Sequence, residues 1–166
     1  MLSREDLIYQ GNADPYLYGG LQNTFYIHGF KLGVYFAYSL GGKIYNYSEI
    51  YMAGSQFANQ YRYMLDAWHP VRNPDSDLPR AGTDDRLVPS SLQVHDASYL
   101  RLKNVTVGYT FPAKLVKKWK IDKARVYVAA QNLWTCTGYS GYDPEVSVRN
   151  SALTPGLDYS SYPRAY

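Results

Sequence analysis

Residues 96–146 read DASYLRLKNVTVGYTFPAKLVKKWKIDKARVYVAAQNLWTCTGYSGYDPEV and contain two alternating runs on either side of a Lys-rich connection. In the first run Val105 and Val107 alternate with Thr106 and Gly108. Because side chains along a strand point to opposite faces with a period of two, this pattern predicts a strand with one apolar face and one small or polar face. The two runs together predict an antiparallel hairpin.

The arms of this hairpin are expected at about Tyr99–Phe111 and Ala124–Thr135, joined through Pro112–Asp122. Near Asn104 the apolar positions change phase, which predicts a β-bulge. The connection carries four lysines among apolar residues, and one helical turn is expected in it. Two interpretations of the connection are open, a basic patch for phosphate or nucleic acid and a solvated turn with an interfacial tryptophan, and its composition favours the second.

A second hairpin is predicted upstream, with strands at Leu21–Ile27 and Phe30–Leu40 around a tight turn at His28 and Gly29. Eleven residues suffice to cross a bilayer when a strand is tilted, since about 9–11 are needed. One face of the sheet is expected to hold the apolar set of both hairpins: Phe30, Val34, Phe36, Val105, Val107 and Tyr109. In a membrane barrel that face meets lipid, whereas in a soluble sandwich it meets a second sheet.

Several motifs favour the barrel. Residues 96–112, 125–135 and 138–146 resemble the C-terminal signature of the SusC/RagA family of TonB-dependent outer-membrane transporters, and residues 11–46 and 155–165 extend the resemblance. The resemblance implies an all-β fold, an antiparallel transmembrane β-barrel fragment that forms an open, curved sheet of membrane-length hairpins with long loops.

Members of that family are large chains with an N-terminal plug and a 22-stranded barrel, which 166 residues cannot close. We therefore expect residues 1–166 to be the C-terminal portion of such a barrel, without plug, signal peptide or final strand. The first ten residues carry Arg4, Glu5 and Asp6 where a signal peptide needs an uninterrupted apolar core.

The resemblance further implies a place in the outer membrane and energised import of oligosaccharides, peptides or other nutrients. The implied partners are a SusD-like lipoprotein, the TonB complex acting through the plug, the lipid bilayer and the imported substrate. The piece alone is not expected to be active. A net charge of +3 is too small and dispersed to suggest nucleic acid as a partner.

Two long loops are expected, Gly41–His95 and a second that begins near Gly138, and the first contains a Pro-rich run that cannot be a regular strand. A short helix is predicted around Ser55–Trp68, with a shared face formed by Phe57, Tyr61, Met64, Leu65 and Trp68. Short connections in barrels of this type face the periplasm and long loops face outside. The candidates for substrate or partner contact in the loops are Trp68, Tyr139, Tyr142 and Asp143.

No catalytic residue, metal site or cofactor is expected. The single cysteine, Cys136, is expected to pack as a small hydrophobe, and the three histidines lack a nucleophile motif. The acidic pairs lack the spacing of a calcium loop and a partnered histidine, so turn formation is their expected role: Asp75/Asp77, Asp84/Asp85 and Asp143/Glu145. The alternative to the transporter is a soluble β-sandwich module that binds glycans through its aromatic loops.

Overall fold

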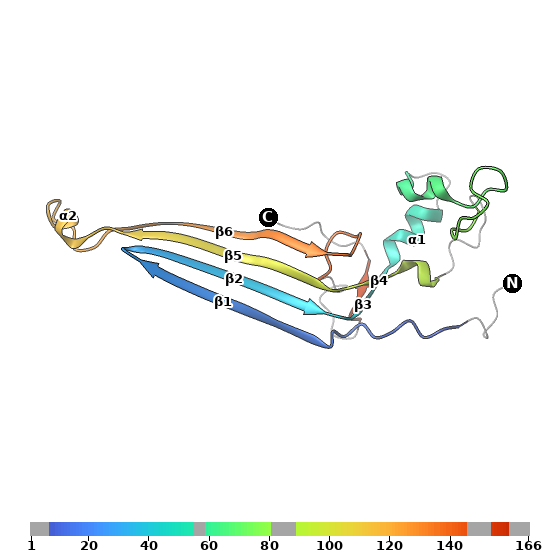
Figure 1. Cartoon of the computed structure of the whole chain (residues 1–166), viewed down its shortest axis with the longest axis horizontal. Helices are drawn as coiled ribbons and strands as arrows, with labels where there is room; N and C mark the ends of the chain where they lie inside the picture. The colour runs from blue at the N-terminus through green and yellow to red at the C-terminus, as the bar shows by residue number, and fades with distance from the viewer. Residues whose placement is uncertain (1–6, 55–58, 81–88, 146–153, 160–166) are drawn as a thin grey trace.

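The computed structural model describes residues 7–54, 59–80, 89–145 and 154–159. Four long strands form one elongated sheet, and most of the short elements gather at one end of it (Figure 1). In chain order the elements are β1 (Leu17–Ile27), β2 (Phe30–Leu40), β3 (Lys43–Asn46), α1 (Tyr47–Gly54), η2 (Arg62–Asp66), η4 (Ser91–Gln93), β4 (Val94–Asp96), β5 (Tyr99–Thr110), α2 (Ala113–Lys117), β6 (Arg125–Thr137) and β7 (Leu157–Asp158).

The long strands pair antiparallel in the order β1-β2-β5-β6, so both predicted hairpins are confirmed. The sheet is open, with β1 and β6 as its edges. Eleven residues, the length of β2, span about 36 Å and rise about 26 Å at a tilt of about 45°, which matches the apolar band of an outer-membrane barrel. Among the described residues, no helix is both long and apolar enough to cross a membrane.

The turn between β1 and β2 has the predicted chemistry. His28 and Gly29 both adopt positive φ, at 48° and 90°, as the two-residue turns that suit strand twist require. A Cβ on Gly29 would lie 2.9 Å from the carbonyl oxygen of Thr110, so the close approach of β5 also requires a glycine at position 29. This turn lies at the same end of the sheet as α2 (Figure 1).

Strand β1 begins at Leu17, four residues before the predicted start. Gly19 and Gly20 were expected to precede the strand, but they lie within it and leave room for tyrosine rings of β2. A Cβ on Gly19 would come within 2.8 Å of the hydroxyl of Tyr38, and one on Gly20 within 2.6 Å of that of Tyr35.

Strand register places the two kinds of side chain on separate faces. Phe30 pairs with Tyr109, Val34 with Val105 and Phe36 with Leu102, so the predicted apolar set lies on one face, as expected. Phe30 is 55% exposed and Val107 46%, the other four members of the set are partly exposed, and Val128, which pairs with Val107 on the same face, is 70% exposed. A sandwich would bury such a face under a second sheet, so the sandwich alternative is wrong for the part of the chain that the structure describes.

The predicted bulge near Asn104 is present. Between the Tyr35–Asn104 and Phe36–Leu102 pairs β5 contains one extra residue relative to β2, and at the same level β6 contains one more than β5. Asn132 takes a φ of 51° in this part of β6. The extra residues explain why the apolar positions change phase, and they bend and twist the sheet locally.

The interior of the protein lies at the loop end, where β3 pairs with β4 and β7 in a second, small sheet. Its most buried apolar residues are Ile44, at 1% exposure, and Ile50, at 3%. The sequence did not predict β3 or α1. Helix α1 follows Asn46, whose side-chain oxygen accepts a hydrogen bond from the Glu49 backbone N–H and so caps the first turn.

The predicted helix over Ser55–Trp68 is wrong in extent. Of this span the structure describes residues 59–68, which contain a 3₁₀ turn at Arg62–Asp66 and no α-helix, and Phe57 lies outside the described residues. Met64 is buried whereas Leu65 is 77% exposed, so the expected shared face does not form. The reason is local, because the Asn73 side chain donates to the carbonyls of Leu65 and Ala67 and stabilises a turn in place of a longer helix.

Candidate functional site

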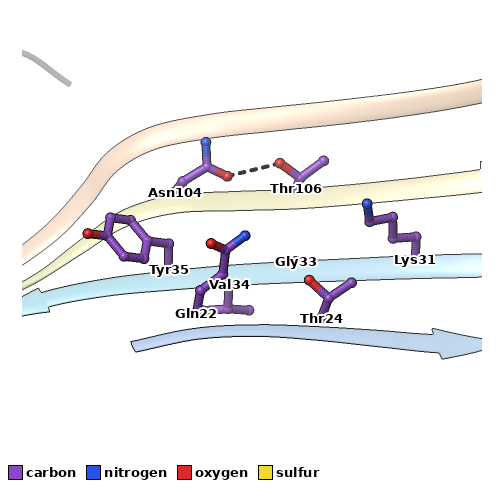
Figure 2. A pocket seen from close by; sticks show the side chains of 8 residues that line it. All are labelled: Gln22, Thr24, Lys31, Gly33, Val34, Tyr35, Asn104 and Thr106. Atoms are coloured by element: carbon purple, nitrogen blue, oxygen red, sulfur yellow. Dashed lines mark hydrogen bonds between the residues drawn. The ribbon is translucent and has the colours of Figure 1, made fainter. Parts of the chain in front are cut away.

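The polar face of the long sheet forms a shallow trough at mid-strand. Its volume is about 350 Å³. The residues that line it come from β1, β2 and β5 and are labelled in Figure 2: Gln22, Thr24, Lys31, Gly33, Val34, Tyr35, Asn104 and Thr106.

The trough offers neutral hydrogen-bonding groups and one cation. Thr106 donates from its hydroxyl to the side-chain oxygen of Asn104 at 2.9 Å, which orients the amide of Asn104. The lining contains amides, hydroxyls and the Lys31 ammonium, and no carboxylate. Such a surface can hydrogen bond to hydroxyl or amide groups of a passing solute, and it has no arrangement of acid, base and nucleophile for catalysis.

At the loop end of the same face, Arg101 clamps the loop that follows β6. Its guanidinium donates to Asp143 at 2.5 Å, to Glu145 at 2.8 Å and to Thr135 at 3.1 Å, and the residue is 6% exposed. Lys103 also contacts Glu145, at 2.8 Å. Asp143 further accepts the Glu145 backbone N–H at 2.9 Å, so the Asp-Pro-Glu segment is fixed to the wall of the sheet.

A polar cluster joins the loop elements to one another. Glu49 of α1 accepts the hydroxyl of Tyr63 at 2.7 Å and lies 2.7 Å from Nε2 of His95 on β4. The His95 ring stands edge-on to Tyr139, with ring centroids 5.8 Å apart. Burial and the Glu49 carboxylate raise the pKa of Tyr63, so this phenol stays protonated and acts as a donor.

Tyr139 continues the cluster to β7, where its hydroxyl donates to Asp158. Both residues are buried, at 4% and 2% exposure. Burial and the hydrogen bond raise the pKa of Tyr139. For Asp158 burial raises the pKa and the Tyr139 hydrogen bond lowers it, and burial dominates, so the net direction is upward.

We expect the loop end to lose stability as the pH rises from acid. Asp158 has a folded-state pKa above its ordinary value of 3.8, so its contribution is complete below that value and is lost as the pH rises through the folded pKa. Asp158→Asn keeps an acceptor for Tyr139 and removes the charge, so it should abolish the trend. Hydrogen exchange of the β3 amides between acid and neutral pH, corrected for intrinsic rates, measures it.

Tyr139→Phe is the complementary variant. It removes the donor and leaves a buried carboxylate with one interaction fewer, so it should steepen the pH trend and cost about 1.5–3 kcal/mol at neutral pH. Equal pH trends in the native chain and in Asp158→Asn would show that another group governs the loop end.

The four predicted contact residues do not form one site. Tyr139 is buried in the polar cluster, and Asp143 is paired with Arg101, so both have structural partners here. Trp68 is 37% exposed and donates from its ring N–H to the Pro74 carbonyl at 3.0 Å. Tyr142 is 59% exposed. Trp68 and Tyr142 are thus the two whose rings are open to a partner.

Sequence reasoning missed Arg101, Glu49 and His95 as organising residues. Arg101 could have been found, because an arginine near the end of a strand, in a segment that also contains an Asp-Pro-Glu loop, suggests an ion pair. Cys136 lies opposite Leu100 on the apolar face and is exposed, so it does not pack inside as expected. Within the described residues no group of three or more potential metal ligands occurs.

The sheet therefore has the two faces of a membrane barrel wall, and comparisons with known proteins agree. The chain is 38% identical over 158 residues to TonB-dependent receptor P3 of Formosa agariphila, and the aligned part makes up 92% of this chain and 16% of the relative. It is 38% identical over 77 residues to TonB-dependent receptor SusC of Bacteroides thetaiotaomicron, 43% of this chain and 7% of the relative. No family model matches.

Solved structures give the same result. The RagAB peptide transporter superposes with a TM-score of 0.82 at 27% identity, over 98% of this chain and 18% of that one. The RagAB peptide importer in its closed-closed state superposes with a TM-score of 0.78 at 29% identity, over 93% of this chain and 16% of that one. The fold and these relatives define an outer-membrane β-barrel protein. The chain belongs to the SusC/RagA type of TonB-dependent receptor, and its matches cover between 7% and 18% of the length of those relatives.

Proposed function

We propose that this chain forms part of the barrel wall of an outer-membrane importer that takes up oligosaccharides, peptides or other nutrients. The observation that carries the proposal is the two-faced sheet, in which exposed apolar side chains of membrane-length strands lie opposite a polar trough. The apolar face would meet lipid and the polar face would line the lumen. The relatives named as receptors and importers support this assignment.

We place residues 1–166 in the C-terminal portion of the barrel, next to strands that continue the sheet at β1 and β6. The open edges and the small share of each relative that the chain covers support a partial barrel, and the C-terminal position rests on the resemblance of residues 96–146 to the family's C-terminal signature. In such a barrel the TonB complex would supply energy through a plug, and a SusD-like lipoprotein would contact the loop end. The loop residues Trp68 and Tyr142 offer exposed aromatic rings for that partner or for the substrate.

The cargo would pass the trough between Gln22 and Thr106 without chemical change. Neutral amides and hydroxyls bind sugar hydroxyls or peptide groups weakly and reversibly, which suits passage better than retention. We infer that the chain is not an enzyme. The likeness to a peptide importer supports peptides as cargo, and the polar groups of the trough suit peptides and oligosaccharides alike.

The orientation is tested by labelling single cysteines in intact cells with a membrane-impermeant maleimide. Cys136→Ala provides the background, Val71→Cys reports the loop end and Lys118→Cys reports the α2 end. Val71 is 82% exposed and Lys118 is exposed, so neither position limits access to the reagent. We expect labelling at position 71 in intact cells and at position 118 only after lysis. The reverse result would place the loop end inside and refute the proposed recognition role.

A further inference from the structure

We propose that the connection between β5 and β6, residues 112–124, docks on the anionic phospholipid headgroups of the membrane leaflet beside it. The inference deepens the proposed function, since it needs the sheet to stand in a bilayer, but it does not depend on the cargo or on the lipoprotein partner. Three observations carry it, namely the charge, the exposed apolar side chains and the aromatic residues that lead to the connection.

The charge of the connection is strongly positive. It contains a single acid, Asp122, and five exposed lysines: Lys114, Lys117, Lys118, Lys120 and Lys123. The ion pairs found within the described residues involve none of these lysines. Such a cluster attracts anions, and phospholipid phosphates are the anions that lie at the end of a membrane-spanning strand.

The connection also exposes apolar side chains from an ordered backbone. Trp119 is 73% exposed and Leu115 58%, whereas Val116 is 2% exposed and forms the inside of the turn. The backbone N–H groups of Trp119 and Ile121 both donate to the Val116 carbonyl, at 3.0 and 3.2 Å. The fold therefore holds Trp119 outward among lysines, which is the combination found at membrane interfaces.

The apolar face of the sheet leads directly to this connection. Phe30 and Tyr109 pack with ring centroids 4.5 Å apart, and Phe111 stands edge-on to Tyr109 at 5.1 Å. Figure 1 shows α2 beyond the ends of β5 and β6, at the end of the sheet away from α1. Along the strand axis the order is thus apolar side chains, aromatic cluster, exposed tryptophan and lysines, which follows the order of hydrocarbon, interface and phosphate in a bilayer.

An acidic protein or a nucleic acid would satisfy the lysines alone. Neither explains why Trp119 and Leu115 are held exposed beside a lipid-facing surface, and a lipid headgroup explains both. Each lysine close to an anionic membrane surface increases binding about fivefold. The five together should enrich anionic lipid around the connection well above its share of the bilayer.

The test places the protein in bilayers of phosphatidylcholine with a minor fraction of phosphatidylglycerol, with brominated acyl chains on one lipid at a time. Trp68→Phe and Trp134→Phe leave Trp119 as the only tryptophan among residues 1–166. We expect the quenching of Trp119 by brominated phosphatidylglycerol to correspond to a local fraction of this lipid about fivefold or more above its fraction in the bilayer. High salt should reduce this enrichment. Changing Lys117, Lys118 and Lys120 to Gln should remove it.

A second set of variants keeps Trp134 as the reporter instead. Trp134 lies on the apolar face opposite Leu102, so both brominated lipids should quench it in proportion to their bulk shares. If Trp134 is quenched and Trp119 is not, or if Trp119 shows no preference for phosphatidylglycerol, the headgroup proposal is wrong and the barrel assignment stands. If neither tryptophan is quenched, the chain does not lie in the bilayer and both proposals fail.

Discussion

Arg101→Leu is expected to release the loop after β6 and to cost about 3–5 kcal/mol, the usual cost of removing one partner from a buried ion pair. The guanidinium is nearly buried and contacts Asp143, Glu145 and Thr135, so its loss leaves a partly buried Asp143 carboxylate without its cation. Hydrogen exchange of residues 139–145 and the midpoint of thermal unfolding both measure the effect.

Lys103→Gln is the matched control for this prediction. Lys103 contacts the same Glu145, but its side chain is 32% exposed, compared with 8% for Arg101. An exposed pair contributes about 0–1 kcal/mol, so this variant should leave the loop protected. If the two variants had equal effects, charge alone would stabilise the loop, and the burial of Arg101 and its contacts with Asp143 and Thr135 would add nothing.

Val107→Arg is expected to impair insertion into the membrane, whereas Thr106→Arg is tolerated. Val107 lies on the apolar face of the central strand β5, and Thr106 is its neighbour on the trough side. An arginine on the lipid face costs about 2–4 kcal/mol at the middle of the bilayer and about 0–1 kcal/mol near its interfaces, so a cost between these limits is expected at Val107, whereas an arginine in the lumen stays hydrated.

The fraction of each variant that resists heat denaturation in detergent, and the amount recovered in outer-membrane fractions, measure this difference. Because the two positions are adjacent, effects of local strand propensity are nearly matched. Equal behaviour of the two variants would mean that the two faces have the same surroundings, which the barrel assignment forbids.

The long strands were predictable because their signals are local. Period-two alternation in Phe30–Leu40 and a turn residue with room for positive φ at Gly29 specify a hairpin without reference to the rest of the chain. The bulge at Asn104 was also visible as a change of phase. The start of β1 was missed because glycines normally weaken a strand. The reason for Gly19 and Gly20 is a tertiary contact, since the tyrosine rings of β2 occupy the space that their side chains would fill.

The loop end was less predictable because it depends on contacts between distant segments. Arg101 and Asp143 are 42 residues apart, and Glu49 and His95 are 46 apart. Tyr139 resembles an exposed loop aromatic in the sequence, yet residues of β4 and β7 enclose it. Short elements such as α1, with eight residues, owe their formation to a cap and to such tertiary contacts rather than to a strong periodic pattern.

In the proposed barrel the long sheet separates lipid from an aqueous lumen. The most direct test is a nitroxide scan of β2 in bilayers, with single labelled cysteines from Lys31 through Phe36 in the Cys136→Ala background. Collision with oxygen is expected to peak at positions 32, 34 and 36, and collision with a water-soluble nickel complex at 31, 33 and 35. Accessibility without a period of two, or with the two reagents reversed, would contradict this arrangement.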